Sequence, residues 1–166
     1  MAVALEEFNT APSQEAAALV RACADVDRWV WAIVAGRPYA SVDDVTSAAE
    51  VVAVPWTDAE IDAALARHPR IGDRPLGAGA DAEMSRREQA DVASDAQTQA
   101  ELAAGNAAYE ARFGHVFLIR AAGRTAPEIL AVLQQRLGNT PEDERQTAAR
   151  ELREIAALRL RGALTR

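Results

Sequence analysis

The sequence predicts an all-α protein, and three observations support this. Hydrophobic residues make up 49% of the 166-residue chain, and many of them are alanine, which favours helices. Aromatic residues are only 5%, and β-branched residues do not form the alternating runs typical of strands. Helix-start signals recur along the chain. We therefore expect residues 1–166 to form one compact domain, a bundle of about six or more helices.

Three helices are predicted in the first half, each beginning at a capping residue. Thr57 and Glu60 match a capping box, and Pro69 must end the helix that they open. Glycine and proline likewise end the two earlier helices. The expected spans are residues 13–35, 41–54 and 57–68.

Three more helices are predicted in the second half. Capping patterns open them at Ser85, Thr125 and Thr140, and proline follows Thr140 at the first helical position. The first runs to about residue 112, the second closes near residue 138, and the third extends toward the end of the chain. Two stretches do not fit a helix: the Gly/Pro-rich residues 70–83 are expected to form a loop, and residues 115–120 form a short apolar segment whose periodicity does not distinguish extended chain from buried helix.

Composition excludes several function classes. The net charge is −7 and the arginines are scattered among acids, so we expect no nucleic-acid partner. Lysine is absent, which excludes Schiff-base, pyridoxal-phosphate and P-loop chemistry. Cys23 is the only cysteine and has apolar neighbours, which indicates a buried thiol. Because there is no membrane-length apolar run, signal-peptide pattern or local metal motif, we expect a cytoplasmic protein with no membrane partner and no metal.

His68 is the first candidate site residue. Helical geometry places it on the same arc as Ile61, Ala64 and Leu65, so it is expected to point inward from the last turn. Histidine exchanges protons near neutral pH, which suits acid–base catalysis. A core histidine bonded to a backbone carbonyl fits the same position, and both interpretations stay open.

Glu88 and Gln89 are the next candidates, at the start of the predicted helix 85–112. Glu88 lies at the edge of its apolar face and Gln89 at its centre, where a buried amide needs a partner. The free N–H groups of this helix N-terminus suit an anionic ligand, although a capping glutamate needs no catalytic role. The residues expected to form the apolar face are Val92, Ala93, Ala96, Ala100, Ala103 and Ala107.

Arg159 falls near the middle of the apolar arc of the last helix, whereas Arg161 falls on the solvent side. A guanidinium inside a core needs an internal acid or an anionic substrate. Both interpretations stay open. The apolar arc consists of Leu152, Ile155, Ala156, Leu158, Leu160 and Ala163.

Five motifs occur in order along the chain: His68-Pro69-Arg70-Ile71-Gly72, Ser85-Arg86-Arg87-Glu88-Gln89, Asn106-Ala107-Ala108-Tyr109-Glu110-Ala111-Arg112-Phe113-Gly114, Phe117-Leu118-Ile119-Arg120 and Leu158-Arg159-Leu160. In this order and spacing they resemble the single-domain bacterial form of 2-oxo-4-hydroxy-4-carboxy-5-ureidoimidazoline (OHCU) decarboxylase, a family of urate breakdown. The resemblance covers nearly the whole chain.

The resemblance implies an all-α homodimer that decarboxylates a small ureidoimidazoline to (S)-allantoin without a cofactor. It implies that His68 is the catalytic acid–base residue, Glu88 its polar partner and Arg159 the arginine that meets the substrate. The substrate-binding residues that it implies are Pro69, Ser85, Arg86, Arg87, Glu88, Gln89, Ile119, Arg120, Ala121, Ala122 and Gly123.

Two other functions fit the same residues. His68, Glu88 and Arg159 form a buried polar network in a helical interaction module, or His68 activates water in a hydrolase of a related ureide. In a catalytic site the three side chains converge on a cavity, whereas a structural network is fully packed. Product analysis separates the decarboxylase from the hydrolase.

Overall fold

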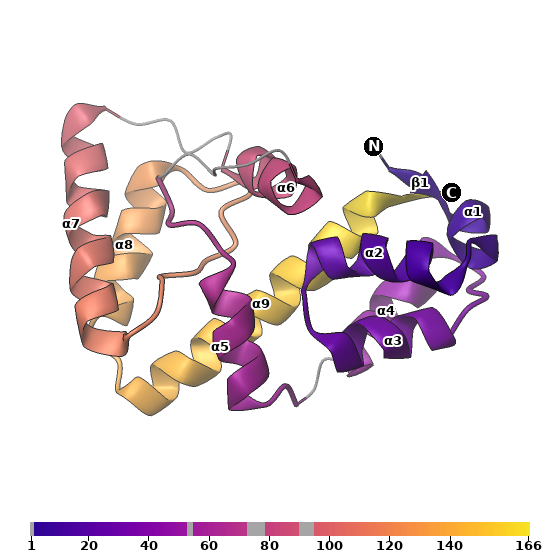
Figure 1. Cartoon of the computed structure of the whole chain (residues 1–166). Helices are drawn as coiled ribbons and strands as arrows, with labels where there is room; N and C mark the ends of the chain where they lie inside the picture. Colours follow the sequence, from indigo (N-terminus) through magenta and orange to yellow (C-terminus); the bar gives the residue numbers. More distant parts are fainter. Residues whose placement is uncertain (1, 53–54, 73–78, 90–94) are drawn as a thin grey trace. The chain divides into compact units, whose positions relative to one another are not determined.

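The computed structural model describes residues 2–52, 55–72, 79–89 and 95–166. These residues form nine helices and two short strands, which confirms the all-α prediction. The chain divides into two compact units. Figure 1 colours the chain by residue number, so the residues of each unit can be located in it. Unit 1 comprises residues 1–64 and 153–166, and unit 2 comprises residues 65–152. The two units are described one at a time, and a single domain over residues 1–166 stays a prediction.

Unit 1 contains the N-terminal helices and the last turns of the C-terminal helix. Its core includes Trp29, whose indole Nε1 donates a hydrogen bond of 2.9 Å to the Ala49 carbonyl. Trp56 packs edge-on against Trp29. The elements are β1 (Val3–Ala4), α1 (Leu5–Thr10), α2 (Ser13–Cys23), α3 (Asp27–Ala35), α4 (Val42–Val52), most of α5 (Asp58–Ala66), the end of α9 (Pro141–Ala163), and β2 (Leu164–Thr165), which pairs in parallel with β1.

The single helix predicted over residues 13–35 is wrong, because two helices occupy that range. Helix α2 ends at Cys23, and Ala24 takes an extended conformation with φ of −158°. Arg21 forms ion pairs of 2.6 Å with both Asp25 and Asp27. Asp25 and Asp27 therefore lie where the two helices are separated, a break that the alanine-rich sequence did not indicate. The negative charge of Asp27 stabilises the N-terminal end of α3.

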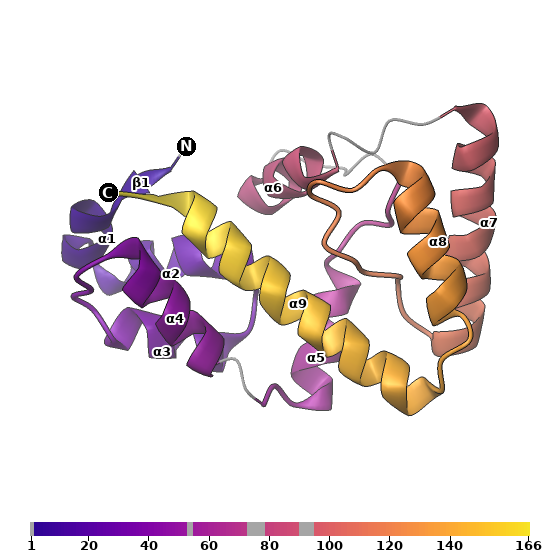
Figure 2. The same ribbon diagram turned by 180° about the vertical axis from the view of Figure 1, so that it is seen from behind.

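Unit 2 contains α6 (Ala80–Glu88), α7 (Ala96–Phe113), α8 (Ala126–Arg136) and the first half of α9. Helices α7 and α8 lie side by side in both views (Figures 1 and 2). They enclose an apolar core with the irregular residues 115–123. Its buried members include Leu102, Tyr109, Phe117, Ile119, Ile129 and Leu133.

The long helix predicted over residues 85–112 is wrong. Ser85 lies inside α6, which begins at Ala80, so residues 80–83 are helical and not part of a loop. The next helix, α7, has its N-cap at Asp95, whose side chain accepts a 2.9 Å hydrogen bond from the Thr98 N–H. The sequence S-x-x-E reads the same in the middle of a helix as at a capping box. This is why the start of the helix was predicted at Ser85. The remainder of the predicted loop, residues 73–78, lies outside the described residues.

The buried face of α7 also differs from the prediction. Leu102, Asn106 and Tyr109 are buried. Large side chains gain more from burial than alanines do, so Leu102 and Tyr109 decide which face packs inward. The predicted Val92 and Ala93 lie outside the described residues, and the others are exposed: Ala96, Ala100, Ala103 and Ala107.

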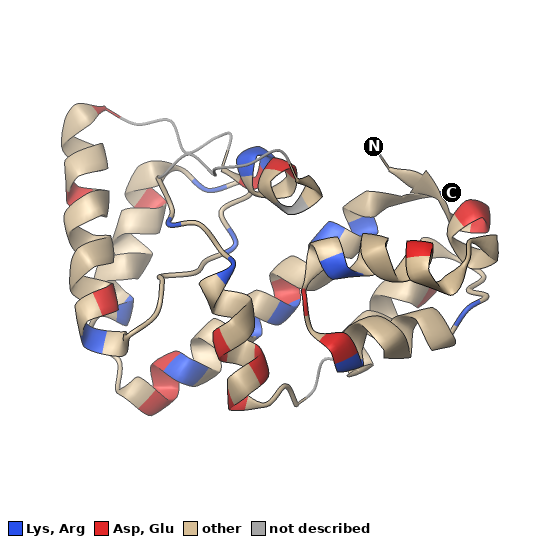
Figure 3. Cartoon of the chain, in the orientation of Figure 1, with Lys and Arg blue, Asp and Glu red and all other residues tan. Residues whose placement is uncertain are grey.

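The remaining predicted helices are confirmed, except that α5 ends at Ala66 and not at residue 68, while residues 53–54 of the predicted helix 41–54 lie outside the described residues. Thr57 and Thr125 form capping boxes with Glu60 and Glu128, and the Thr140 hydroxyl accepts from the N–H three residues later. Residues 115–120 form no helix or strand, and three of them are buried. Acidic and basic residues are interspersed along the helices, as on α9 (Figure 3). No helix in the described part of the chain combines the length and apolarity that crossing a membrane requires.

Candidate active site

His68 lies in a turn just beyond α5, which ends at Ala66. The prediction that His68 belongs to the last turn of the helix is therefore wrong. Its backbone N–H donates a 3.0 Å hydrogen bond to the Leu65 carbonyl. The predicted neighbours Ile61, Ala64 and Leu65 are buried. The imidazole Nε2 is shielded from solvent, whereas the residue as a whole is half-buried. The residue therefore combines a shielded ring nitrogen with partial exposure to solvent.

Residues 70–72, which follow the histidine, are held by helix α7. Arg70 donates two hydrogen bonds of 2.6 Å to the Glu110 carboxylate, a bidentate ion pair at the surface. The Ile71 carbonyl accepts a 2.9 Å bond from Nδ2 of the buried Asn106. Together these two α7 side chains fix the chain just beyond His68.

Gln89 supplies a third contact to the same segment. Its Oε1 accepts a 3.0 Å hydrogen bond from the Gly72 N–H. Gly72 has φ of +91°, a conformation that L side chains rarely adopt, so glycine is required here. Gln89 has a partner, as the sequence predicted, but it is the half-exposed C-cap of α6 and not a buried residue at the centre of an apolar face. The bond also joins two motifs that are distant in sequence.

A small cavity of about 80 Å³ lies beside this segment. Asn106 Oδ1 is buried there and has no hydrogen-bond partner among the described residues. The cavity is polar at this point and large enough for a water molecule. Its lining comprises Arg70, Ile71, Gly72, Gln99, Leu102, Ala103 and Asn106.

Residues 85–89 occupy the C-terminal end of α6. Ser85 is buried, Glu88 is the last helical residue, and Gln89 is the C-cap. The prediction of an anion-binding helix N-terminus at Ser85 is therefore wrong, since the dipole at a C-terminus favours cations. Arg86 and Arg87 in the last turn fit this polarity. An anionic substrate bound at this end of α6 would have to be stabilised by cationic side chains, because the helix dipole does not favour an anion there.

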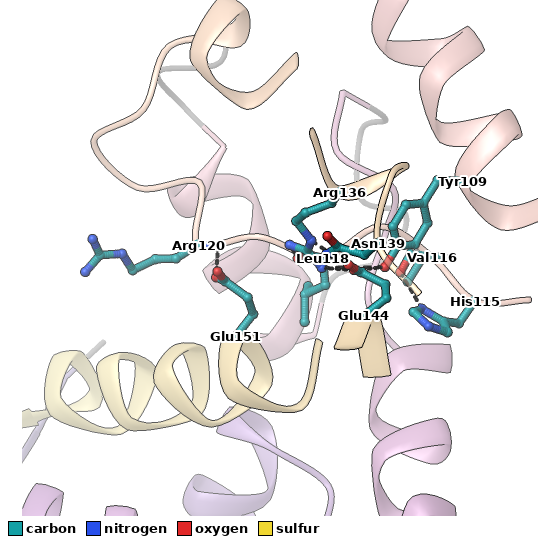
Figure 4. Close-up of polar contacts among 9 residues, drawn as sticks. All are labelled: Tyr109, His115, Val116, Leu118, Arg120, Arg136, Asn139, Glu144 and Glu151. Carbon is teal, nitrogen blue, oxygen red and sulfur yellow. Dashed lines mark hydrogen bonds and ion pairs between the residues drawn. The ribbon is translucent and has the colours of Figure 1, made fainter. Parts of the chain in front are cut away.

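Residues 119–123 form an irregular segment ending in a turn. Ile119 and Ala121 are buried, whereas the Arg120 side chain is exposed and points away from the other labelled residues in Figure 4. The Arg124 N–H donates to the Ala121 carbonyl at 3.0 Å. Gly123 within this turn has φ of +78°. The Arg120 carbonyl accepts a 3.1 Å hydrogen bond from Arg124 Nε, so hydrogen bonds within the protein already engage part of the backbone of this segment.

A buried charged cluster lies behind this segment. Arg136 donates to the Leu118 carbonyl at 2.8 Å and forms an ion pair with the fully buried Glu144. Tyr109 donates its hydroxyl proton to the same carboxylate, and Asn139 donates to its other oxygen at 2.8 Å. Burial, reinforced by the bond to Glu144, raises the pKa of Tyr109 well above its ordinary value. The phenol therefore stays neutral and donates.

The sequence reasoning missed this cluster. A signal was present, because Ile129, Leu133 and Arg136 share one helical face in α8. An arginine on an apolar face indicates a buried partner. No pattern in the sequence identifies Glu144, which lies in the first turn of α9, as the partner of Arg136.

Arg159 is buried on α9 within unit 1, as predicted, and Ile155, Ala156 and Leu160 on the same helix are buried too. Leu158, expected on the apolar arc, is 43% exposed, whereas Ala157, which was not expected there, is buried, so the arc is rotated from the predicted one. Arg161 is exposed, as predicted, and lies 2.8 Å from Asp43. Among the candidate residues, the structure joins the His68 and Ser85 motifs within unit 2 and places Arg159 in unit 1.

No group of three or more His, Cys, Asp or Glu side chains in the described ranges is arranged to hold a metal ion. The described part of unit 2 thus joins residues 70–72, just after His68, to the end of the Ser85–Gln89 motif through the Gly72–Gln89 hydrogen bond. Residues 9–161 match the family model described as OHCU decarboxylase. The chain therefore belongs to the OHCU decarboxylase family and is a carboxy-lyase of urate degradation.

Individual relatives agree with this assignment. The chain is 35% identical to the 2-oxo-4-hydroxy-4-carboxy-5-ureidoimidazoline decarboxylase of Amia calva over 145 residues, covering 86% of this chain and 81% of that protein. It is 36% identical over 101 residues to the uric acid degradation bifunctional protein TTL of Arabidopsis thaliana, covering 58% of this chain and 31% of the relative.

Solved structures have the same fold. A crystal structure of OHCU decarboxylase in the presence of (S)-allantoin matches with a TM-score of 0.71 and 25% identity, over 86% of this chain and 94% of that one. A crystal structure of (S)-allantoin synthase matches with a TM-score of 0.72 over 98% of this chain and 54% of that one. At 18% identity, the second likeness concerns the fold alone.

Proposed function

We propose that this protein converts 2-oxo-4-hydroxy-4-carboxy-5-ureidoimidazoline to (S)-allantoin without a cofactor. Beyond the family assignment, the observation that supports this most directly is the Gly72–Gln89 hydrogen bond. It holds the chain after His68 against the end of the Ser85–Gln89 motif. Two of the segments that the resemblance assigns to the reaction thus lie together.

The substrate carries its own electron sink. Loss of carbon dioxide leaves an electron pair on the ring carbon that bore the carboxylate, and the neighbouring carbon–nitrogen double bond accepts it. The ring nitrogen that takes the electron pair gains a proton, a second proton must reach one face of the adjacent ring carbon, and the hydroxyl must lose its proton to become the carbonyl, so one proton is consumed overall. The protein needs to orient the substrate, stabilise charge and deliver that proton.

His68 and Glu88 manage the hydroxyl proton and the final protonation of the ring carbon, and Arg159 meets the anionic substrate. A guanidinium is suited to binding a carboxylate with two parallel hydrogen bonds. Residues 85–89 and 119–123, with Pro69, contact the substrate. This division of roles needs no lysine, which the chain lacks.

We also predict a homodimer from the family resemblance, which light scattering after size-exclusion chromatography would test. A cytoplasmic location stays a prediction from the sequence.

The experiment is a coupled conversion of urate. Urate is oxidised in the presence of hydroxyisourate hydrolase with and without this protein, and circular dichroism follows the optical activity of allantoin. We expect optically active (S)-allantoin at once, with carbon dioxide released at the same rate. Slow, racemic allantoin would reject the proposal.

Two other outcomes correspond to the other functions considered. A ureide hydrolase would consume the intermediate without an equal release of carbon dioxide. An interaction module would leave the spontaneous decay unchanged.

A further inference from the structure

Ile119 is flanked by two anchored peptide groups. On one side, Arg136 Nη1 donates a 2.8 Å hydrogen bond to the Leu118 carbonyl. On the other, the Arg120 N–H donates a 2.9 Å hydrogen bond to Glu151 Oε2. The anchors come from α8 and α9, and Figure 4 shows them on either side of the segment. Two charged side chains thus fix the backbone where the segment 119–123 begins.

The Arg136 anchor is itself held in place. Its Nε lies 2.9 Å from Glu144 Oε1, and its guanidinium carbon lies 4.7 Å from the centroid of the Phe117 ring. Both members of the ion pair are buried, which strengthens their hydrogen bonds. The guanidinium is therefore a fixed point for the Leu118 carbonyl.

The Glu151 anchor acts on the backbone and not on a side chain. The Arg120 guanidinium points away into solvent, while its amide is held by the carboxylate (Figure 4). Glu151 is half-buried. The Arg120 carbonyl accepts a 3.1 Å hydrogen bond from Arg124 Nε, so both backbone polar groups of Arg120 are engaged within the protein and are not left to contact the substrate.

We propose that Arg136 and Glu151 are positioning residues that hold the segment 119–123 in its substrate-binding geometry. This inference rests on the proposed function, which assigns that segment to substrate contact. Small displacements of a binding group are costly in catalysis, so an anchor that touches no substrate still affects the rate.

Glu151 provides the sharper test, since its side chain is half-exposed and its replacement leaves the buried core unchanged. The variants are Glu151→Met, which removes the acceptor, and Glu151→Gln, which keeps one. Glu154→Met is the matched control, because Glu154 is an exposed glutamate on the same helix. For each, kcat and KM are measured for (S)-allantoin formation, with melting temperature and hydrogen exchange of residues 118–123.

We expect Glu151→Met to raise KM or lower kcat, with a loss in kcat/KM of about 10-fold, the scale of one charge-assisted hydrogen bond. Amide exchange in residues 118–123 should accelerate. Glu151→Gln should recover most of the loss, and Glu154→Met should match the wild type.

The inference is overturned if Glu151→Met keeps wild-type kcat, KM and exchange while the wild type is active. It is also overturned if Glu151→Gln is as impaired as Glu151→Met, since the retained acceptor would then not matter. An inactive wild type would instead reject the proposed function. Hydrogen exchange in the same variants would still test the anchoring.

Arg136→Lys tests the second anchor. A lysine cannot reproduce the fork that contacts both Glu144 and the Leu118 carbonyl. We expect faster exchange at residues 118–123 and a loss of kcat/KM of at least about 10-fold in folded protein. Wild-type exchange and kinetics in a folded Arg136→Lys variant would contradict the role of Arg136.

Discussion

Two irregular segments of unit 2 are held by different kinds of side chain. Residues 70–72 are held by the neutral amides of Asn106 and Gln89 and by an ion pair at the surface. Residues 118–120 are held by charged side chains, one of them in a fully buried cluster. Surface pairs contribute little because water and ions screen them, whereas buried charges depend entirely on their partners. The second segment should therefore be far more sensitive to single substitutions than the first.

The largest effect is expected from Glu144→Leu. This change leaves Arg136 buried without its carboxylate, at a cost of about 3–5 kcal/mol in the free energy of unfolding. Combining it with Arg136→Met should recover much of that loss, because no uncompensated charge then remains. Urea denaturation measures both variants. A loss below about 1 kcal/mol for Glu144→Leu would show that this cluster is no more sensitive than a surface pair.

Asn106→Leu should have an intermediate effect. The Ile71 carbonyl loses its donor while it remains buried, which costs about 1–3 kcal/mol. Ala107→Leu is the matched control, because it adds a leucine on the exposed face of the same helix. Thermal and urea unfolding report the difference. Equal stability of the two variants would contradict the role given to the Asn106 amide.

The buried cluster also predicts a pH dependence above pH 10. The pKa of Tyr109 is raised in the folded protein, so the unfolded chain loses this proton first. The stability is therefore fully present below the unfolded pKa of about 10 and falls as the pH rises toward the folded pKa, by up to about 1.4 kcal/mol per pH unit. Burial also raises the pKa of Tyr39, so Tyr109→Phe should reduce this slope and leave the part that Tyr39 contributes. Unfolding by urea at a series of alkaline pH values measures it, and identical slopes in both proteins would argue against the buried phenol.

The smallest effect is expected at the surface anchor. Arg70→Gln removes a pair whose arginine side chain is 52% exposed, which costs about 0.2–1 kcal/mol and less at high salt. Differential scanning calorimetry at low and high salt checks this. A loss comparable to that of Glu144→Leu would remove the contrast between the two segments.

The sequence was informative where the signals are local. Thr57, Thr125 and Thr140 open helices as predicted, because a capping side chain and its partner lie three residues apart. The same logic failed at Ser85, where the pattern lies inside a helix, while Asp95 with Thr98 marks the real cap.

Contacts between distant elements could not be read from the sequence. Only packing brings Arg136 and Glu151 to the backbone of residues 118–120, and only packing brings Glu144 on α9 to Arg136 on α8. Gln89 was recognised as needing a partner, but nothing in the sequence identified Gly72. The burial of Arg159 followed from helical periodicity alone, because its neighbours on α9 define one apolar arc.

The most direct test of the account is the rate of (S)-allantoin formation by His68→Asn compared with the wild type. If His68 is the acid–base residue, the rate falls by about 10²–10⁴-fold while the far-ultraviolet circular dichroism spectrum is unchanged. A folded His68→Asn protein with the wild-type rate and the same optical purity of product would contradict the assignment.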